Sequence, residues 1–458
     1  MNGPTGSAPA PGYWPSPWSC EDGGPARRQV AAPGWGGAGG LVRAGGLASG
    51  GLASGEPGAG GPEDGGPPHL EVTSRVAVAS TMVVTRDPGQ VYLLRHTAGD
   101  DAVSFVERID PRTLEPLGRS ADLAGGPAWP GSIAAHADGS LIVVFGDHAH
   151  RLDADLSVEA SAELPVRAPY NGFVILPDGT VVTKNSAASR PGHPVAAADR
   201  QPCELVALDP ANLATIDRCT LPEASIARLS ADGDTVYVVG DTSFFAVPWD
   251  GAFRPDRGIR AAYRTAEGQT YGWDAVITGS TAWFLDDGEG SDAYDGTLRG
   301  HGVSTAPLHL VRVDLDSGAV TTIEVSGLAG GLIANPPLVD PHRGVAVGFD
   351  SGNGVMAAFD IGVGAPAGAP ITPRWTRAQD HAPHMVLLPG SGEIVTCDFA
   401  RDRGAEQVVV LDLETGDELA RADTGSPVQS VLFPAVGFDR DIYLCTFASV
   451  SRVTAAGR

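Results

Sequence analysis

The chain has 458 residues, and its 55 acidic residues against 31 basic ones give a formal net charge of −24. An acidic surface of this kind repels phosphate backbones, which argues against nucleic acid as a partner. No run of about 20 apolar residues is present, and no apolar run follows a basic patch at the N-terminus, so neither a membrane-spanning helix nor a signal peptide is predicted. We therefore expect a soluble cytoplasmic protein without membrane association, and we expect a monomer.

Residues 1–68 are rich in Gly, Pro and Ala, with runs such as Gly36-Gly37-Ala38-Gly39-Gly40. A segment with so few periodic apolar residues buries too little surface to offset its ordering entropy. The sequence therefore predicts a disordered segment at 1–68, followed by a single folded domain at 69–458.

From about residue 70, short apolar runs alternate with turn signals, as in Phe173–Gly179 and Val408–Gly416. These are strand and hairpin patterns, and no amphipathic helical stretch of any length competes with them. The chain is therefore expected to be all-β.

The strand pattern repeats along the chain. The second strand of each unit ends in an acidic residue or Asn, and gaps between these positions run from 38 to 64 residues, near the ~40–50 of propeller blades. These positions are Asp147, Asn185, Asp241, Asp286, Asp350 and Asp398. The repeat predicts a β-propeller of eight four-stranded blades. Seven blades is the alternative if the first unit is irregular.

The last unit, residues 428–455, supplies only three strands, at Ser430–Phe433, Asp441–Cys445 and Ser449–Val453. The strand-like segment Leu70–Val78 has no blade of its own. We expect this N-terminal strand to complete the last blade and close the ring.

Turns such as Leu411-Asp412-Leu413-Glu414-Thr415-Gly416, together with the blade period, resemble those of the bacterial quinoprotein-like and WD40-like β-propeller superfamily over residues 70–455. The resemblance implies the propeller fold. The quinone-binding dehydrogenases of that superfamily typically carry a Trp after the Thr-Gly turn and often a vicinal Cys pair. Here Asp417 follows the turn and no two cysteines are adjacent, which argues against a bound quinone such as PQQ.

The five cysteines, an odd number without a secretion signal, favour free thiols. They are Cys20, Cys203, Cys219, Cys397 and Cys445. A disulfide between Cys203 and Cys219, which flank a predicted hairpin turn, is the alternative. Because no CxxC spacing exists, a structural zinc site is not expected.

In a propeller blade, the start of the first strand and the end of the second emerge on the same face, around the channel mouth. Candidate ligand-binding residues at these positions are Asn171, Asn185 and Gln429. For the repeated Asp residues, the alternative is that they cap strand ends and accept hydrogen bonds from turn amides.

Candidate catalytic residues at the same positions are His384, Asp274 and Lys184. Lys184 is the only lysine in the chain. A partly buried amine has a lowered pKa and can act as a base or an anion ligand, whereas a lysine that extends to the rim is the alternative.

Candidate metal ligands are His381, His384, Asp286 and Asp398. The two histidines, in Asp380-His381-Ala382-Pro383-His384, suit a transition metal, and the acidic loop Asp286–Asp295 suits Ca²⁺. Ordinary hydrogen-bonded histidines and a solvated loop are the alternatives. Apart from such a divalent metal, the cofactor is unknown.

The convergence of polar strand ends favours a propeller that binds a small polar ligand or metal at its channel mouth, with acid–base or metal-assisted catalysis. We expect Asn171, Lys184, Asp274, Asp286, His384 and Asp398 to line one cavity there. The alternative function is a non-catalytic scaffold that binds a protein partner through exposed apolar patches.

Overall fold

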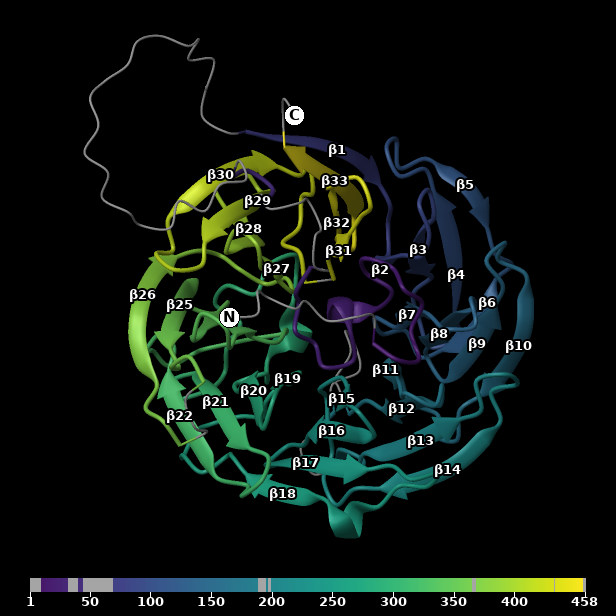
Figure 1. Ribbon diagram of the computed structural model, residues 1–458, viewed down its shortest axis with the longest axis horizontal. Helices are drawn as coiled ribbons and strands as arrows, with labels where there is room; N and C mark the ends of the chain where they lie inside the picture. Colours follow the sequence, from purple (N-terminus) through teal and green to yellow (C-terminus); the bar gives the residue numbers. More distant parts are fainter. Residues whose placement is uncertain are drawn as a thin grey trace.

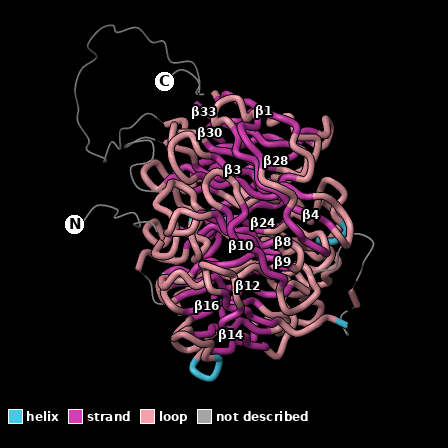
Figure 2. Tube along the Cα trace, turned by 90° about the vertical axis from the view of Figure 1, so that its right-hand side faces the viewer, coloured by secondary structure: helices cyan, strands magenta, loops and turns pink. Residues whose placement is uncertain are grey.

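The computed structural model describes residues 10–31, 40–43, 69–187, 195–196, 199–364, 368–431 and 433–455. These residues form a ring of eight β-sheets around a central channel (Figure 1), which confirms the predicted eight-bladed propeller. They include short 3-10 helices at Glu21–Gly23 (η1), Pro255–Arg257 (η3) and Ser291–Ala293 (η4). In the side view, loops extend from both faces of the ring (Figure 2).

The first four blades follow one another along the chain. Blade 1 has strands β2 (Ser80–Thr85), β3 (Val91–His96), β4 (Ala102–Ile109) and β5 (Pro116–Arg119), with β6 (Leu123–Gly126) also paired to β4. Blade 2 has β7 (Ser132–Ala135), β8 (Leu141–Phe145), β9 (His148–Leu152) and β10 (Val158–Glu163). Blade 3 has β11 (Tyr170–Ile175), β12 (Val181–Asn185), β13 (Glu204–Leu208) and β14 (Thr215–Thr220). Blade 4 has β15 (Ser230–Asp232), β16 (Thr235–Val239), β17 (Ser243–Pro248) and β18 (Ile259–Ala262).

The remaining blades complete the ring. Blade 5 has β19 (Val276–Thr278), β20 (Thr281–Leu285), β21 (His309–Asp314) and β22 (Val320–Glu324). Blade 6 has β23 (Leu338–Asp340), β24 (Val345–Asp350), β25 (Val355–Asp360) and β26 (Thr372–Ala378). Blade 7 has β27 (Val386–Leu388), β28 (Glu393–Ala400), β29 (Ala405–Asp412) and β30 (Glu418–Asp423). Blade 8 has β31 (Ala435–Val436), β32 (Ile442–Cys445), β33 (Ser449–Ala455) and β1 (Leu70–Val76).

Strand composition follows position in the blade. The second strands, such as β8, are buried on both faces and read as continuous apolar runs. The outermost strands, such as β14, alternate half-buried and exposed side chains and are largely polar. The core therefore lies between neighbouring blades.

The turns between the third and fourth strands of a blade are closed by hydrogen bonds to an Asp side chain at the start of the turn. Oδ1 of Asp412 accepts the backbone N–H groups of Glu414 (2.7 Å) and Thr415 (2.9 Å), and Asp314 makes the equivalent bonds in blade 5. Gly416 closes the first of these turns with φ of +74°, a conformation that favours glycine. These aspartates are turn residues.

Strand β1 closes the ring as predicted. It pairs antiparallel with β33 along its whole length, from Leu70 opposite Ala455 to Val76 opposite Ser449. The innermost strand of this blade differs from the prediction, because it lies at Ala435–Val436 rather than Ser430–Phe433. Leu432 lies outside the described residues.

Residues 10–31, which we call the channel segment, lie at the centre of the ring (dark purple in Figure 1). Its backbone carbonyls accept N–H bonds from the innermost strands of blades 1, 2, 4, 5 and 7. The donors are Thr85, Ala135, Ala231, Ile277 and Leu387, at 2.7 to 2.9 Å. The segment also buries Tyr13 and Trp18.

The expectation of disorder at 1–68 therefore does not hold for the channel segment, nor for residues 40–43, of which Leu41 and Arg43 donate their backbone N–H groups to the buried carboxylate of Glu393. The physical reason is that the ring supplies the partners that the segment lacks on its own. Residues 1–9, 32–39 and 44–68 lie outside the described residues.

All five cysteines are free, as expected; Cys219 is half-buried and the other four are buried. The helices of the described residues include none long and apolar enough to cross a membrane.

Candidate functional site

A pocket of about 500 Å³ lies on the face where first strands begin and second strands end. We call it the mouth pocket, and its defining residues are His96, Trp129, Arg228, Trp273, Tyr294 and Phe447. His96 is the last residue of β3, and the others come from the connections that precede β7, β15 and β19 or follow β20 and β32. The pocket therefore occupies the face that topology predicted for a ligand, but its lining residues differ from the candidates.

Two polar or aromatic residues of this lining, Arg228 and Trp273, are buried, with exposures of 5% and 3%. Nε of Arg228 donates to the backbone carbonyl of Asn171 at 2.7 Å, and its guanidinium lies 4.5 Å from the ring centroid of Phe433. The indole Nε1 of Trp273 is buried and has no hydrogen-bond partner. Arg228 is therefore held in place, whereas the indole donor is free.

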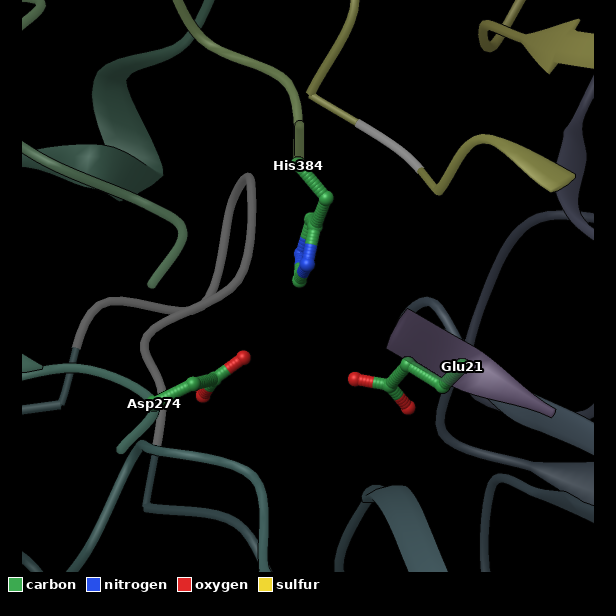
Figure 3. A group of neighbouring side chains, drawn as sticks. All are labelled: Glu21, Asp274 and His384. Atoms are coloured by element: carbon green, nitrogen blue, oxygen red, sulfur yellow. The ribbon is translucent and has the colours of Figure 1, made fainter. Parts of the chain in front are cut away.

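Arg228 also connects the pocket to a group of charged side chains buried in the channel. Its Nε lies 3.4 Å from Oε1 of Glu21, and its Nη1 lies 3.9 Å from Oδ2 of Asp274. Glu21, Asp274 and His384 each direct one possible ligand atom toward the others, and these atoms lie within 4.8 Å of one another (Figure 3). Glu21 comes from η1 of the channel segment, and the other two precede β19 and β27.

Two further residues of the channel segment complete this group. Arg27 contacts Glu21 and lies 2.8 Å from Oδ2 of Asp22. Oδ1 of Asp22 lies 2.5 Å from Nδ1 of His384. Three carboxylates and two guanidiniums thus surround one imidazole.

Burial and the neighbouring charges together set the pKa values of this group. Burial raises the pKa of Glu21 above its usual value, and raises that of Asp22 to about 6 against the opposing effect of Arg27. Burial lowers the pKa of Arg27, but the carboxylates of Glu21, Asp274 and Asp22 outweigh it and hold that pKa above its usual value. Burial keeps the pKa of His384 well below its usual value, so the imidazole is neutral.

Of the predicted catalytic residues, the structure brings Asp274 and His384 together. Lys184 is fully buried, and its Nζ donates to the backbone carbonyls of Ser225 (3.1 Å) and Asn185 (3.3 Å). Burial lowers the pKa of Lys184 to about 8. The side chain does not line the mouth pocket.

The predicted ligand-binding residues support other elements. Nδ2 of Asn171 donates to the carbonyl of Ile226 (2.9 Å), and Asn185 connects Pro202 to Glu204. Oε1 of Gln429 accepts the N–H of Leu298 (2.9 Å), and its backbone carbonyl accepts the hydroxyl of Tyr294 (2.8 Å). Asn171 and Gln429 thus hold residues that line the pocket without lining it themselves.

The four predicted metal ligands do not form one site. Nδ1 of His381 contacts Oγ1 of Thr396 (2.6 Å), Asp286 contacts His309 (2.9 Å), and Asp398 pairs with Arg421 (2.9 Å). Within the described part of the chain, the one group of three metal-ligating side chains contains His384 alone of the four. None of the six candidates expected to share one cavity lines the mouth pocket. Four of them bond to backbone carbonyls or to side-chain partners instead, namely Asn171, Lys184, Asp286 and Asp398.

Sequence reasoning missed Glu21, Asp22 and Arg27 because they fall in the segment predicted to be disordered. A signal was present: residues 10–31 contain Tyr13, Trp14 and Trp18, whereas residues 32–68 contain one aromatic residue, Trp35. Aromatic side chains are the residues that bury most surface, so their clustering distinguishes the channel segment from the rest.

Among solved structures, the chain is similar to a quinohemoprotein alcohol dehydrogenase from Comamonas testosteroni, with 11% identity, 84% of this chain and 76% of that chain covered, and a TM-score of 0.53. It is also similar to such an enzyme from Pseudomonas putida HK5, with 11% identity, coverages of 86% and 76%, and a TM-score of 0.52. BamB from Moraxella catarrhalis matches with 13% identity, coverages of 83% and 100%, and a TM-score of 0.49.

No protein-family model matches the chain, and no curated protein matches it either. At these identities the structural likeness concerns the fold alone: the chain has a β-propeller fold similar to that of the quinohemoprotein alcohol dehydrogenases.

Proposed function

We propose that this propeller binds a small, mainly apolar molecule that carries hydrogen-bonding groups at one end, and that the molecule occupies the mouth pocket. The main support is the indole N–H of Trp273, a buried donor without a partner in the protein. A buried unsatisfied donor costs about 1–3 kcal/mol, and an acceptor on a ligand would remove this cost.

A second polar atom of the pocket supports the same ligand chemistry. Nδ1 of His96 contacts the carbonyl of Thr97 at 2.5 Å, and burial lowers the pKa of His96, so the neutral ring carries its proton on Nδ1. Its Nε2 is then an acceptor, and it also has no partner. A fitting ligand offers an acceptor to Trp273 and a donor to His96.

The size and walls of the pocket define the rest of the ligand. Ligand pockets typically measure about 300–1,000 Å³ and have mostly apolar linings. Here the volume is about 500 Å³, and Trp129, Tyr294 and Phe447 provide aromatic wall. The proposed ligand is therefore amphipathic, whereas the strand ends led us to expect a small polar ligand or a metal.

Binding is the part of the predicted function that these contacts support. Catalysis by His384, Asp274 and Lys184, the cytoplasmic location and the monomeric state stay predictions. The scaffold alternative differs in a measurable way, because it requires no small-molecule binding that depends on the pocket.

Titration with the amphipathic fluorophore 8-anilinonaphthalene-1-sulfonate tests the proposal. The wild-type chain should bind one equivalent with a saturable blue-shifted emission. Ala128 also lines the pocket, so Ala128→Trp should fill it and weaken binding at least tenfold. Trp273→Phe, which removes the free donor, should weaken binding several-fold. The matched controls are Ala211→Trp, in an exposed turn, and Trp283→Phe, whose indole N–H bonds to Thr281 (2.9 Å). Equal binding by Ala128→Trp and the wild type would contradict the proposal and favour the scaffold.

A further inference from the structure

The buried charged group beneath the mouth pocket has the composition of a metal centre. Glu21, Asp274 and His384 are exposed by 5%, 0% and 1%, and their possible ligand atoms lie within 4.8 Å of one another. In Figure 3 the imidazole and the two carboxylates point into the same space from three sides. One imidazole nitrogen and two carboxylate oxygens converge from three distant parts of the chain.

Two of these side chains carry a polar atom that lacks any hydrogen-bond partner. Nε2 of His384 and Oδ2 of Asp274 are both buried and unpartnered. The other oxygen of Asp274, Oδ1, accepts the backbone N–H of Arg228 at 2.6 Å, which fixes the carboxylate with Oδ2 free. Buried polar atoms are rarely left unsatisfied, so the two orphaned acceptors in this group support a bound cation.

The second nitrogen of His384 is arranged as in known metal sites. Nδ1 lies 2.5 Å from the Asp22 carboxylate, so it donates its proton there and leaves the Nε2 lone pair free. Metal-ligating histidines commonly donate their other ring N–H to a carboxylate, which orients the ring and raises its basicity. Asp22 therefore acts as a positioning residue for His384.

The local charge also accommodates a cation. With all groups ionised, Glu21, Asp22 and Asp274 carry three negative charges, whereas Arg27 and Arg228 carry two positive ones. Arg27 and Arg228 lie 3.8 and 3.9 Å from Oδ2 of Asp274, beyond hydrogen-bond distance. The guanidiniums thus offset part of the negative charge without occupying the free acceptor.

We propose that Glu21, Asp274 and His384 bind one divalent transition-metal ion of the Zn²⁺, Co²⁺ and Mn²⁺ class. The imidazole ligand favours this class over Ca²⁺ and Mg²⁺, which prefer oxygen ligands alone. Because Glu21 belongs to the channel segment and the other two ligands belong to blades 5 and 7, the ion joins the segment to the ring.

Metal binding by the full-length chain tests this inference. After dialysis against a chelator, Zn²⁺ titration by calorimetry and elemental analysis should give one ion per chain. Asp274→Asn and His384→Gln, which preserve size, should each weaken binding at least tenfold. Asp22→Asn should weaken it less, through the lost orientation of the ring. The matched control His381→Gln, at a buried histidine outside the group, should bind as the wild type does.

The bound ion should also stabilise the wild-type chain against heat and should not stabilise the ligand variants. Binding that survives both Asp274→Asn and His384→Gln would overturn the proposal by assigning the ion to surface acidic groups, and so would a wild type that binds no ion. Should those variants fail to fold, pulsed electron paramagnetic resonance of the Mn²⁺-loaded wild type decides: nitrogen coupling from one imidazole supports the site, and its absence overturns it.

Discussion

Oδ1 of Asp22 lies 2.5 Å from Nδ1 of His384, although 362 positions separate the two residues in the sequence. Both side chains are fully buried, and the other oxygen of Asp22 contacts Arg27. The channel segment is therefore joined to blade 7 through this carboxylate–imidazole contact as well as through backbone bonds. Buried charges are costly once their partners are removed, so we expect the pairing of Asp22 with Arg27 to contribute to the free energy of unfolding.

Two adjacent arginines of the channel segment should differ sharply in how much they contribute to the free energy of unfolding. Arg27 is 2% exposed and pairs with Glu21 and Asp22, so Arg27→Ala leaves buried carboxylates without their cation and should cost about 3–5 kcal/mol. Arg28 pairs with Asp232 at the surface, and Arg28→Ala should cost less than about 1 kcal/mol. Denaturant unfolding measures both losses. If Arg27→Ala cost as little as Arg28→Ala is expected to cost, the stability of the segment would not depend on its buried charges.

The stability of the protein should depend on pH through Glu406. This side chain is fully buried, and burial raises its pKa from 4.5 to about 8. The folded state then binds more protons than the unfolded state between these values, so the contribution of Glu406 is full below pH 4.5 and is lost as the pH rises through 8.

Glu406→Gln should remove this dependence, since the amide keeps the neutral form at every pH. Relative to the variant, the wild type should lose about 1.4 kcal/mol per pH unit across this window. Unfolding in denaturant at pH 5, 6, 7 and 8 measures the difference. Parallel curves for the two proteins would show that Glu406 is ionised in the folded state.

Ring closure by β1 should be essential for the last blade. Replacing Leu70–Val76 by a Gly/Ser segment of equal length removes the outer strand and exposes the edge of β33, which should lower the melting temperature and promote association. Val76→Ser and Val78→Ser, at side chains exposed by 77% and 62%, should leave the melting temperature nearly unchanged. A ring that melts as before without β1 would exclude closure by this strand.

Thiol titration should distinguish Cys219 from the other cysteines. Cys219 alone is half-buried, so one thiol should react with Ellman's reagent in the native protein and five in denaturant. Cys219→Ser should remove the native reaction. Only three reactive thiols in denaturant would instead reveal a disulfide.

Most of the fold could be predicted because its signals are local. The turn at Asp412 to Gly416 is fixed by bonds within five residues, and the same signal recurs from blade to blade. The place of strand β1 could be predicted by counting strands, because the last unit had only three and the strand at the N-terminal end of the domain had no blade of its own. By contrast, every backbone partner of the channel segment given above belongs to the ring, and no property of residues 10–31 by themselves encodes those partners.

For the site, the sequence could predict the face of the ring on which it lies but not which side chains line it. Topology places Trp273, Asp274 and His384 near the channel mouth, but it does not set the depth of a side chain. Trp273 lines the pocket whereas its neighbour Asp274 points into the channel, and Lys184 bonds to carbonyls. These differences arise from packing between blades, which strand patterns do not encode.

The pairing of β1 with β33 also governs the order of events during synthesis. Ser74 and Ser451, which contact each other across these strands, are 377 positions apart. At roughly 5–20 residues per second, β1 leaves the ribosome about 20 to 75 seconds before its partner exists. Its sequence, Leu-Glu-Val-Thr-Ser-Arg-Val, intersperses charged and hydroxyl side chains among three apolar ones. Such polar residues keep an unpaired strand from associating with neighbouring chains. The composition of β1 therefore suits a strand that stays unpaired until the rest of the chain has been synthesised.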